Sequence, residues 1–385
     1  MPTPDAAPAA ARRSGEAAGA DVRAPRRGYL DWLRGLAVLI MIEAHVLDAW
    51  TRLDQRQSVL YGWAMIAGGF GAPLFLFLAG LSVSLSAGSK LRKTADPRAA
   101  SRAVVRRGLE IFGLAFLFRL QAWAISWGAA RSLLKVDILN IMGPSIMAAA
   151  WLWGGFRSAR ARAAGFVVAA LAIALLTPPV RATWIFAFLP DFIEGYIRPR
   201  PGFTTFAFFP WAGFVFAGAF AGVLLDTARN RVTETALNTR LLLGGVLLAA
   251  GAYAASFLPS PFARSEFWTS SPSFFLLRTG VLICSVGVAF RIRLFVQETR
   301  LHAWPAFSPL EQLGRTSLFI YWIHVEMIYG LMAKPLHKSL SFGKALTALV
   351  VFALWMLVCS LLKERVVAWW HARAHPAAGN LQSAN

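Results

Sequence analysis

Ten long apolar stretches constrain the fold of this chain more than any other feature of its sequence. Each is long enough to span, taking roughly 17 to 25 mainly apolar residues as the length that an α-helix needs to cross a bilayer. Hydrophobic residues make up 57% of the 385 residues and charged residues 15%, whereas soluble domains carry about 25% charged residues. Because lipid cannot satisfy backbone polar groups, we predict an all-α polytopic membrane helix bundle of about ten transmembrane helices. The expected helices cover residues 34–51, 60–86, 104–127, 136–154, 163–180, 205–225, 241–258, 273–290, 316–333 and 345–362.

Lys and Arg residues are concentrated in alternate connecting segments, on the side of the membrane that holds the amino terminus. This bias is typical of cytoplasmic segments and places both termini in the cytoplasm. The formal net charge of +20 arises from short clusters between apolar stretches and not from one basic face, so we expect no nucleic-acid partner. Two further arginines, Arg119 and Arg278, fall inside expected helices.

The apolar stretches form one expected domain between two polar ends. Residues 1–27 are rich in Ala, Arg and Gly and lack the apolar core of a secretory signal, which predicts a disordered basic cytoplasmic tail. Residues 28–370 hold the helices, and residues 371–385 are expected to form a second cytoplasmic tail. Cys284 and Cys359 lie in apolar stretches, so neither a disulfide nor a metal site is indicated. The six histidines form no ligand-like cluster, and no metal is expected.

The first expected helix carries ionisable residues that a simple membrane anchor lacks. Arg34, His45 and Asp48 recur at near-helical intervals and share one stripe of the helix. Ionisable groups at bilayer depth are costly and usually line a functional site. Asp48 follows His45 by three residues, where a carboxylate can orient an imidazole that takes up a proton. We therefore predict that His45 is a general base and that Asp48 is its partner.

Two other polar features have two interpretations each. Asp31 and Arg34 are three residues apart at the cytoplasmic end of the first helix, where they form either a structural pair or a site for an anionic group. The longest non-cytoplasmic segment, residues 181–204, mixes aromatic and charged residues. That mixture suits a carbohydrate or other polar acceptor, and it equally suits an interfacial aromatic belt.

A late helix repeats the arrangement of the first. Ser317, Tyr321 and His324 follow one another at spacings of four and three and share a face. We predict that this face closes the other wall of the His45 site, with the two histidines within about 10 Å of each other, as for packed helices. The alternative is that His324 hydrogen-bonds a backbone carbonyl between helices.

Five sequence blocks in order resemble a known family. Small residues and a proline in the second helix suit a helix that lines a cavity, and that helix contains one of the blocks. The blocks are Leu30–Gly35, Phe75–Gly80, Asp137–Gly143, Phe209–Gly213 and Leu313–His324. Together they resemble the transmembrane acyltransferase superfamily, and more specifically the bacterial relatives of heparan-α-glucosaminide N-acetyltransferase. The resemblance runs from about residue 28 to residue 365.

The resemblance implies that an acyl group, in particular acetyl from acetyl-CoA, moves to a sugar amine or hydroxyl on the non-cytoplasmic side of a bacterial inner (plasma) membrane. It makes His45 the candidate base and Arg34, with Asp31 beside it, a candidate contact for the acyl-CoA donor. Trp211, in the fourth block, is a candidate acceptor contact, as are Ser317 and Tyr321. The chain departs from the lysosomal branch because residues 51–62 contain no histidine.

Acyl-CoA is a polyanion, so its entrance must be basic. A run of cytoplasmic Lys and Arg residues can supply this charge, although the same residues serve as topology signals. The run comprises Lys90, Arg92, Lys93, Arg98, Arg102, Arg106 and Arg107.

A secondary transporter is the alternative function, since interrupted helices with midplane ionisable residues are also typical of transporters. A scaffold or sensor without chemistry would leave the two midplane histidines unexplained. The sequence does not fix the oligomeric state.

Overall fold

The computed structural model describes residues 27–126, 129–298 and 307–374 of the chain. Over these residues the chain is helical, with two isolated β-bridges and no strand. The predicted all-α class is therefore confirmed. The tails predicted at 1–27 and 371–385 lie almost wholly outside the described residues, except that the last helix continues to Ala374.

The order of the helices follows the apolar stretches. The α-helices are α1 (Gly28–Trp50), α2 (Val59–Gly68), α3 (Gly71–Thr94), α4 (Pro97–Ser126), α5 (Ile138–Gly155), α6 (Ala159–Ala182), α7 (Asp191–Ile197), α8 (Phe208–Thr227), α9 (Arg231–Ala255), α10 (Pro272–Glu298), α11 (Pro309–Arg315), α12 (Ser317–Tyr329) and α13 (Phe342–Ala374). Short 3₁₀ helices lie at Leu53–Gln57, Ala130–Leu134, Ile185–Phe188 and Leu331–Leu336.

Seven helical segments among the described residues are long and apolar enough to cross a membrane, compared with about ten expected. They correspond to α2 with α3, α4, α6, α8, α9, α10 and α13. The other three expected helices are α1, α5 and α12. Helix α1 carries too many charges to be counted among the seven, namely Asp31, Arg34, Glu43 and Asp48, and α12 has only 13 residues. The count of ten and the sidedness of the termini stay predictions.

The second expected span is broken near its start. Residues 60–86 were expected to form one helix, but α2 ends at Gly68 and α3 begins at Gly71. The break leaves small residues beside α1, because a side-chain carbon added to Gly68 would lie 2.8 Å from the Cβ of Ala44. The late span expected at 316–333 begins as predicted with α12 at Ser317, but α12 ends at Tyr329 and a 3₁₀ helix follows at Leu331–Leu336.

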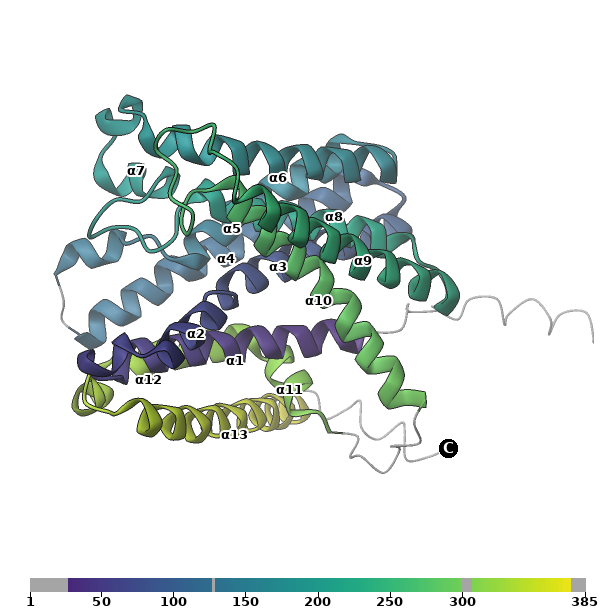
Figure 1. Ribbon diagram of the computed structural model, residues 1–385. Coiled ribbons are helices and arrows are strands. Elements are labelled where there is room, and N and C mark those ends of the chain that lie inside the picture. The colour runs from purple at the N-terminus through teal and green to yellow at the C-terminus, as the bar shows by residue number, and fades with distance from the viewer. Residues whose placement is uncertain (1–26, 127–128, 299–306, 375–385) are drawn as a thin grey trace, which may run out of the picture.

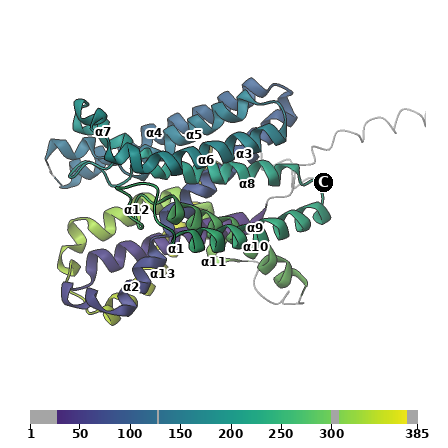
Figure 2. The same ribbon diagram turned by 45° about the horizontal axis from the view of Figure 1, so that its top comes forward.

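Helix α1 lies between two groups of helices, as Figures 1 and 2 show. One face of α1 joins a large apolar core with α3, α4, α5, α6, α8 and α10. Another face joins a smaller core with α11, α12 and α13. In Figure 1 the start of α1 and the end of α13 lie at the same end of the bundle. The carboxyl-terminal part of α1 is thus placed at the seam between the two groups.

Glycines allow the closest helix crossings. A Cβ added to Gly35 of α1 would lie 1.9 Å from the Leu310 carbonyl oxygen of α11, and one added to Gly314 would lie 1.9 Å from the Asp31 carbonyl oxygen. The α3–α8 pair crosses in the same way at Gly80 and Gly218. Small residues permit such backbone contact between membrane helices. Three of these four glycines belong to the family-like blocks, which gives those blocks a structural role.

The block Asp137–Gly143 anchors α5 and the segment outside it. The Asp137 carboxylate accepts hydrogen bonds from the backbone N–H groups of Leu139 and Asn140, a capping box at the start of α5. The same carboxylate pairs with Arg119 of α4 at 2.9 Å. The Asn140 side chain donates to the Tyr196 hydroxyl of α7 at 3.0 Å. Capping and pairing together join α4, α5 and α7 at one end of the bundle.

Candidate active site

Two histidines from distant parts of the chain meet at the seam. His45 Nδ1 of α1 lies 3.0 Å from His324 Nε2 of α12, and the two ring planes differ by only 10°. His324 is fully buried, whereas His45 is partly exposed. The expectation that the two histidines lie within about 10 Å of each other is confirmed.

The hydrogen bonds fix which nitrogen of each neutral ring carries its proton. His324 Nδ1 lies 2.8 Å from the backbone carbonyl oxygen of Ile320, which can only accept. His324 Nδ1 therefore donates, and its Nε2 is left to accept from His45 Nδ1–H. The second nitrogen of His45, Nε2, then carries a lone pair. This chain of donors gives His45 the tautomer of a general base.

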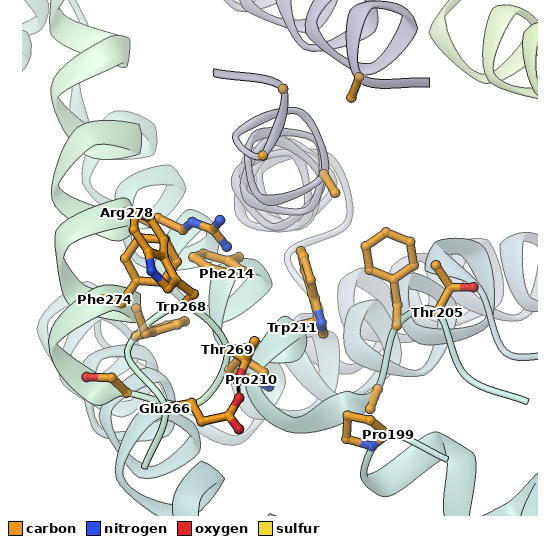
Figure 3. Close-up of a pocket in the computed structure, with 18 of the residues that line it drawn as sticks. Pro199, Thr205, Pro210, Trp211, Phe214, Glu266, Trp268, Thr269, Phe274 and Arg278 are labelled. Carbon is orange, nitrogen blue, oxygen red and sulfur yellow. Dashed lines mark hydrogen bonds between the residues drawn. The ribbon is translucent and has the colours of Figure 1, made fainter. Parts of the chain in front are cut away.

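His45 lines a cavity of about 610 Å³ between the ends of α1, α2, α8 and α10. In Figure 3, Arg278, Phe274 and Trp268 cluster on one wall, and Trp211 stands across the cavity from them. Glu266 lies beside Thr269 in the same view, and its carboxylate accepts from the Thr269 hydroxyl at 3.0 Å. Such a cavity, with aromatic walls and a few polar groups, is typical of a small-molecule site.

Asp48 does not provide the hydrogen bond that was expected for His45. Its carboxylate accepts from the Tyr329 hydroxyl at 3.1 Å and lies 3.5 Å from a guanidinium nitrogen of Arg56. Asp48 thus ties the end of α1 to the neighbouring 3₁₀ helix and to the end of α12. The orientation expected from Asp48 comes instead from His324, because Nδ1 of His45 faces α12.

The candidate donor contacts lie away from the cavity. Arg34 pairs with Asp31 at 2.5 Å and donates to the Ser82 hydroxyl of α3 at 2.6 Å, which agrees with the structural interpretation of this pair. Arg106 and Arg107 are exposed on α4 and pair with Glu110 of the same helix. None of these residues lines the cavity that holds His45.

The candidate acceptor contacts divide into two groups. Trp211 lines the cavity and packs edge-on against Phe206 at 4.6 Å between ring centroids. Tyr321 is buried against Phe75 and the edge of His324, and neither it nor Ser317 lines the cavity. The face of α12 therefore contributes His324 behind His45 and does not form an open wall.

Sequence reasoning missed most of the polar residues in the cavity. Arg278 was noted inside a span, and its position alone could have marked it, since a charge within a membrane helix usually faces a cavity or a partner. Arg181 and Glu266 also line the cavity. No spacing pattern links them to His45, because they come from the end of α6 and the α9–α10 connection.

Residues 26–257, more than half of the chain, match the family model "Heparan-alpha-glucosaminide N-acetyltransferase, catalytic". The chain belongs to this family. None of the curated proteins matches the chain. The family and the apolar helices together make it an integral membrane protein of an N-acetyltransferase family. The match includes His45 and Trp211 and ends just after α9, so His324 and Arg278 lie beyond it.

Proposed function

We propose that this protein transfers an acetyl group from cytoplasmic acetyl-CoA to a sugar amine on the non-cytoplasmic side of a bacterial inner membrane, with His45 as the general base. The observation that supports this most is the hydrogen-bond chain from His45 through His324 to the Ile320 carbonyl. That chain leaves Nε2 as the nitrogen of His45 that is able to accept a proton, and His45 is one of the residues that line the cavity.

The proposed reaction is direct transfer. His45 Nε2 accepts a proton from the acceptor amine as the nitrogen attacks the thioester carbonyl. A C–N bond forms, the C–S bond breaks, and the departing thiolate receives the proton from the imidazolium. His324 Nε2 accepts from His45 Nδ1–H throughout and stabilises the positive charge on His45.

Donor and acceptor are proposed to approach from opposite ends of α3. The basic run Lys90–Arg107 lies at the carboxyl-terminal end of α3 and the first turns of α4, where it attracts a polyanion. Arg102, Arg106 and Arg107 pair with acids of their own segment, so we assign them general attraction and not specific phosphate contacts. The cavity that holds His45 lies at the other end, beside Gly68 and Gly69.

A test compares purified wild-type protein with His45→Ala in detergent, using radiolabelled acetyl-CoA and glucosamine. We expect the variant to lose about 10²- to 10⁴-fold in kcat, the usual effect of removing a general base. His371→Ala serves as the control, because His371 is exposed on α13. Normal turnover by a His45→Ala protein that elutes as wild type on gel filtration would contradict the proposed mechanism.

A further inference from the structure

Arg278 lies in the wall of the cavity and has no acidic partner among the residues that the structure describes. Its guanidinium carbon lies 4.1 Å from the centre of the Phe274 ring and 5.8 Å from that of Phe70. Its Nε is buried and has no hydrogen-bond partner. Among the described residues, no carboxylate lies within 4.0 Å of it, whereas Arg119 and Arg198 each have a buried acid. An uncompensated charge at this depth is costly and usually serves a ligand.

The charge of the cavity favours an anion. Its lining residues include two arginines, Arg181 and Arg278, and one acid, Glu266. Nε of Arg181 is also buried without a partner. A second cavity of about 370 Å³ shares Arg181 and Glu266 and adds Glu194, Arg198, Arg200 and Arg264. Arg198 and Arg200 pair with Glu194, but the arginines in this lining still outnumber the acids. A ligand that enters through this region therefore meets an excess of positive charge, which raises the local concentration of anions.

The acyl-CoA donor is also an anion. In the proposed reaction its phosphates bind at the carboxyl-terminal end of α3, whereas Arg278 lies near the amino-terminal end. Nη2 of Arg278 lies beside Gly69, just before α3 begins. Lys90 and Arg92 lie about 29 and about 32 Å from the start of α3, at about 1.5 Å per residue. Arg278 is thus placed at the acceptor end of the site.

We propose that Arg278 binds an anionic substituent of the acceptor, a carboxylate, sulfate or phosphate on the amino sugar, and so sets the preference of the enzyme. This inference rests on the proposed acetyl transfer. The planar guanidinium can donate two parallel hydrogen bonds to any of these groups. The rings of Phe274 and Phe70 hold the guanidinium in place by cation–π contact, and Trp211 across the cavity offers a stacking face for the sugar ring.

The experiment uses four acceptors that differ at one position: glucosamine, its 6-sulfate, its 6-phosphate and the corresponding 6-carboxylate. Acetyl transfer is measured for wild type, Arg278→Gln and Arg278→Met. Arg291→Gln is the control, because Arg291 lies on the same helix and binds Thr239 outside the cavity. We expect wild type to prefer at least one charged acceptor by tenfold or more in kcat/KM, and which acceptor this is identifies the anion.

Both Arg278 variants should lose that preference, measured as the ratio of kcat/KM for the charged acceptor to kcat/KM for glucosamine, whereas Arg291→Gln should keep it. Equal rates for all four acceptors in wild type would overturn the inference, as would Arg278 variants that keep the preference.

Calorimetric binding of the charged acceptors separates this test from the proposed function. Arg278-dependent binding without any acetyl transfer would refute the reaction and leave the anion site standing. If both variants fail to fold, Arg278→Lys decides the question, because lysine keeps the charge but cannot donate the two parallel hydrogen bonds of a guanidinium. An unchanged preference in this variant would overturn the inference.

Discussion

At the scale of single residues, a carbonyl oxygen determines the state of the proposed base. The Ile320 carbonyl accepts from His324, which fixes the proton on Nδ1 of His324 and leaves its Nε2 to accept from His45. A neutral imidazole with this partner keeps its lone pair on Nε2, on the ring edge away from His324. His324 is then a positioning residue that acts through His45.

His324→Phe keeps a ring in the buried site and removes the acceptor for His45, whereas His324→Gln retains an acceptor oxygen. We expect His324→Phe to lower kcat by about 10- to 100-fold, the usual effect of losing an orienting partner, and His324→Gln to lower it less. Activity should rise with pH in all variants, because only unprotonated His45 accepts a proton. The pH–activity profile of His324→Phe should differ from that of the wild type, since the imidazolium of His45 loses a stabilising partner. A pH–activity profile that is unchanged in both variants would assign His324 a packing role only.

At the scale of helices, the crossings of backbone on backbone hold the site together. Gly35 and Gly314 bring α1 against α11, and α12 with His324 follows α11 directly. Gly80 and Gly218 bring α3 against α8, whose first turn carries Trp211. Both walls of the cavity therefore depend on helices that cannot move apart without losing these contacts.

Gly80→Val should destabilise the protein, because even a Cβ would lie 1.9 Å from the Val215 carbonyl oxygen. Overpacking of this kind typically costs about 1–3 kcal/mol, and more where backbone must move. Gly244→Val is the matched control, since a Cβ at this helical glycine of α9 meets nothing within 4 Å. Thermal unfolding in detergent, followed by gel filtration, measures both variants. Equal unfolding temperatures would show that the α3–α8 crossing adapts to a larger residue.

At the scale of the whole molecule, the sequence predicts the fold class and the proximity of His45 and His324. It does not predict most of the residues that line the cavity. Apolar stretches of spanning length predict the all-α bundle, and helical spacing predicts the face of α12 that meets His45. The break at Gly68–Phe70 could not be predicted by hydropathy, because both sides of it are apolar. Arg278 was visible inside a span, but its place beside Gly69 depends on how α10 packs against α2 and α3. The hydrogen bond expected between Asp48 and His45 does not form for a related reason. The partner of a side chain is determined by the neighbouring helices as well as by the helix that carries it.

Transfer across the membrane is the central claim, and inverted membrane vesicles from cells that express the protein test it most directly. Acetyl-CoA is added outside, on the face that was cytoplasmic, and radiolabelled glucosamine is trapped inside. We expect N-acetylglucosamine to accumulate inside vesicles with the wild-type protein and not inside those with His45→Ala, which lack the base. Counter-flow of glucosamine or uptake of intact acetyl-CoA, without acetylation, would contradict this account and identify the protein as a secondary transporter.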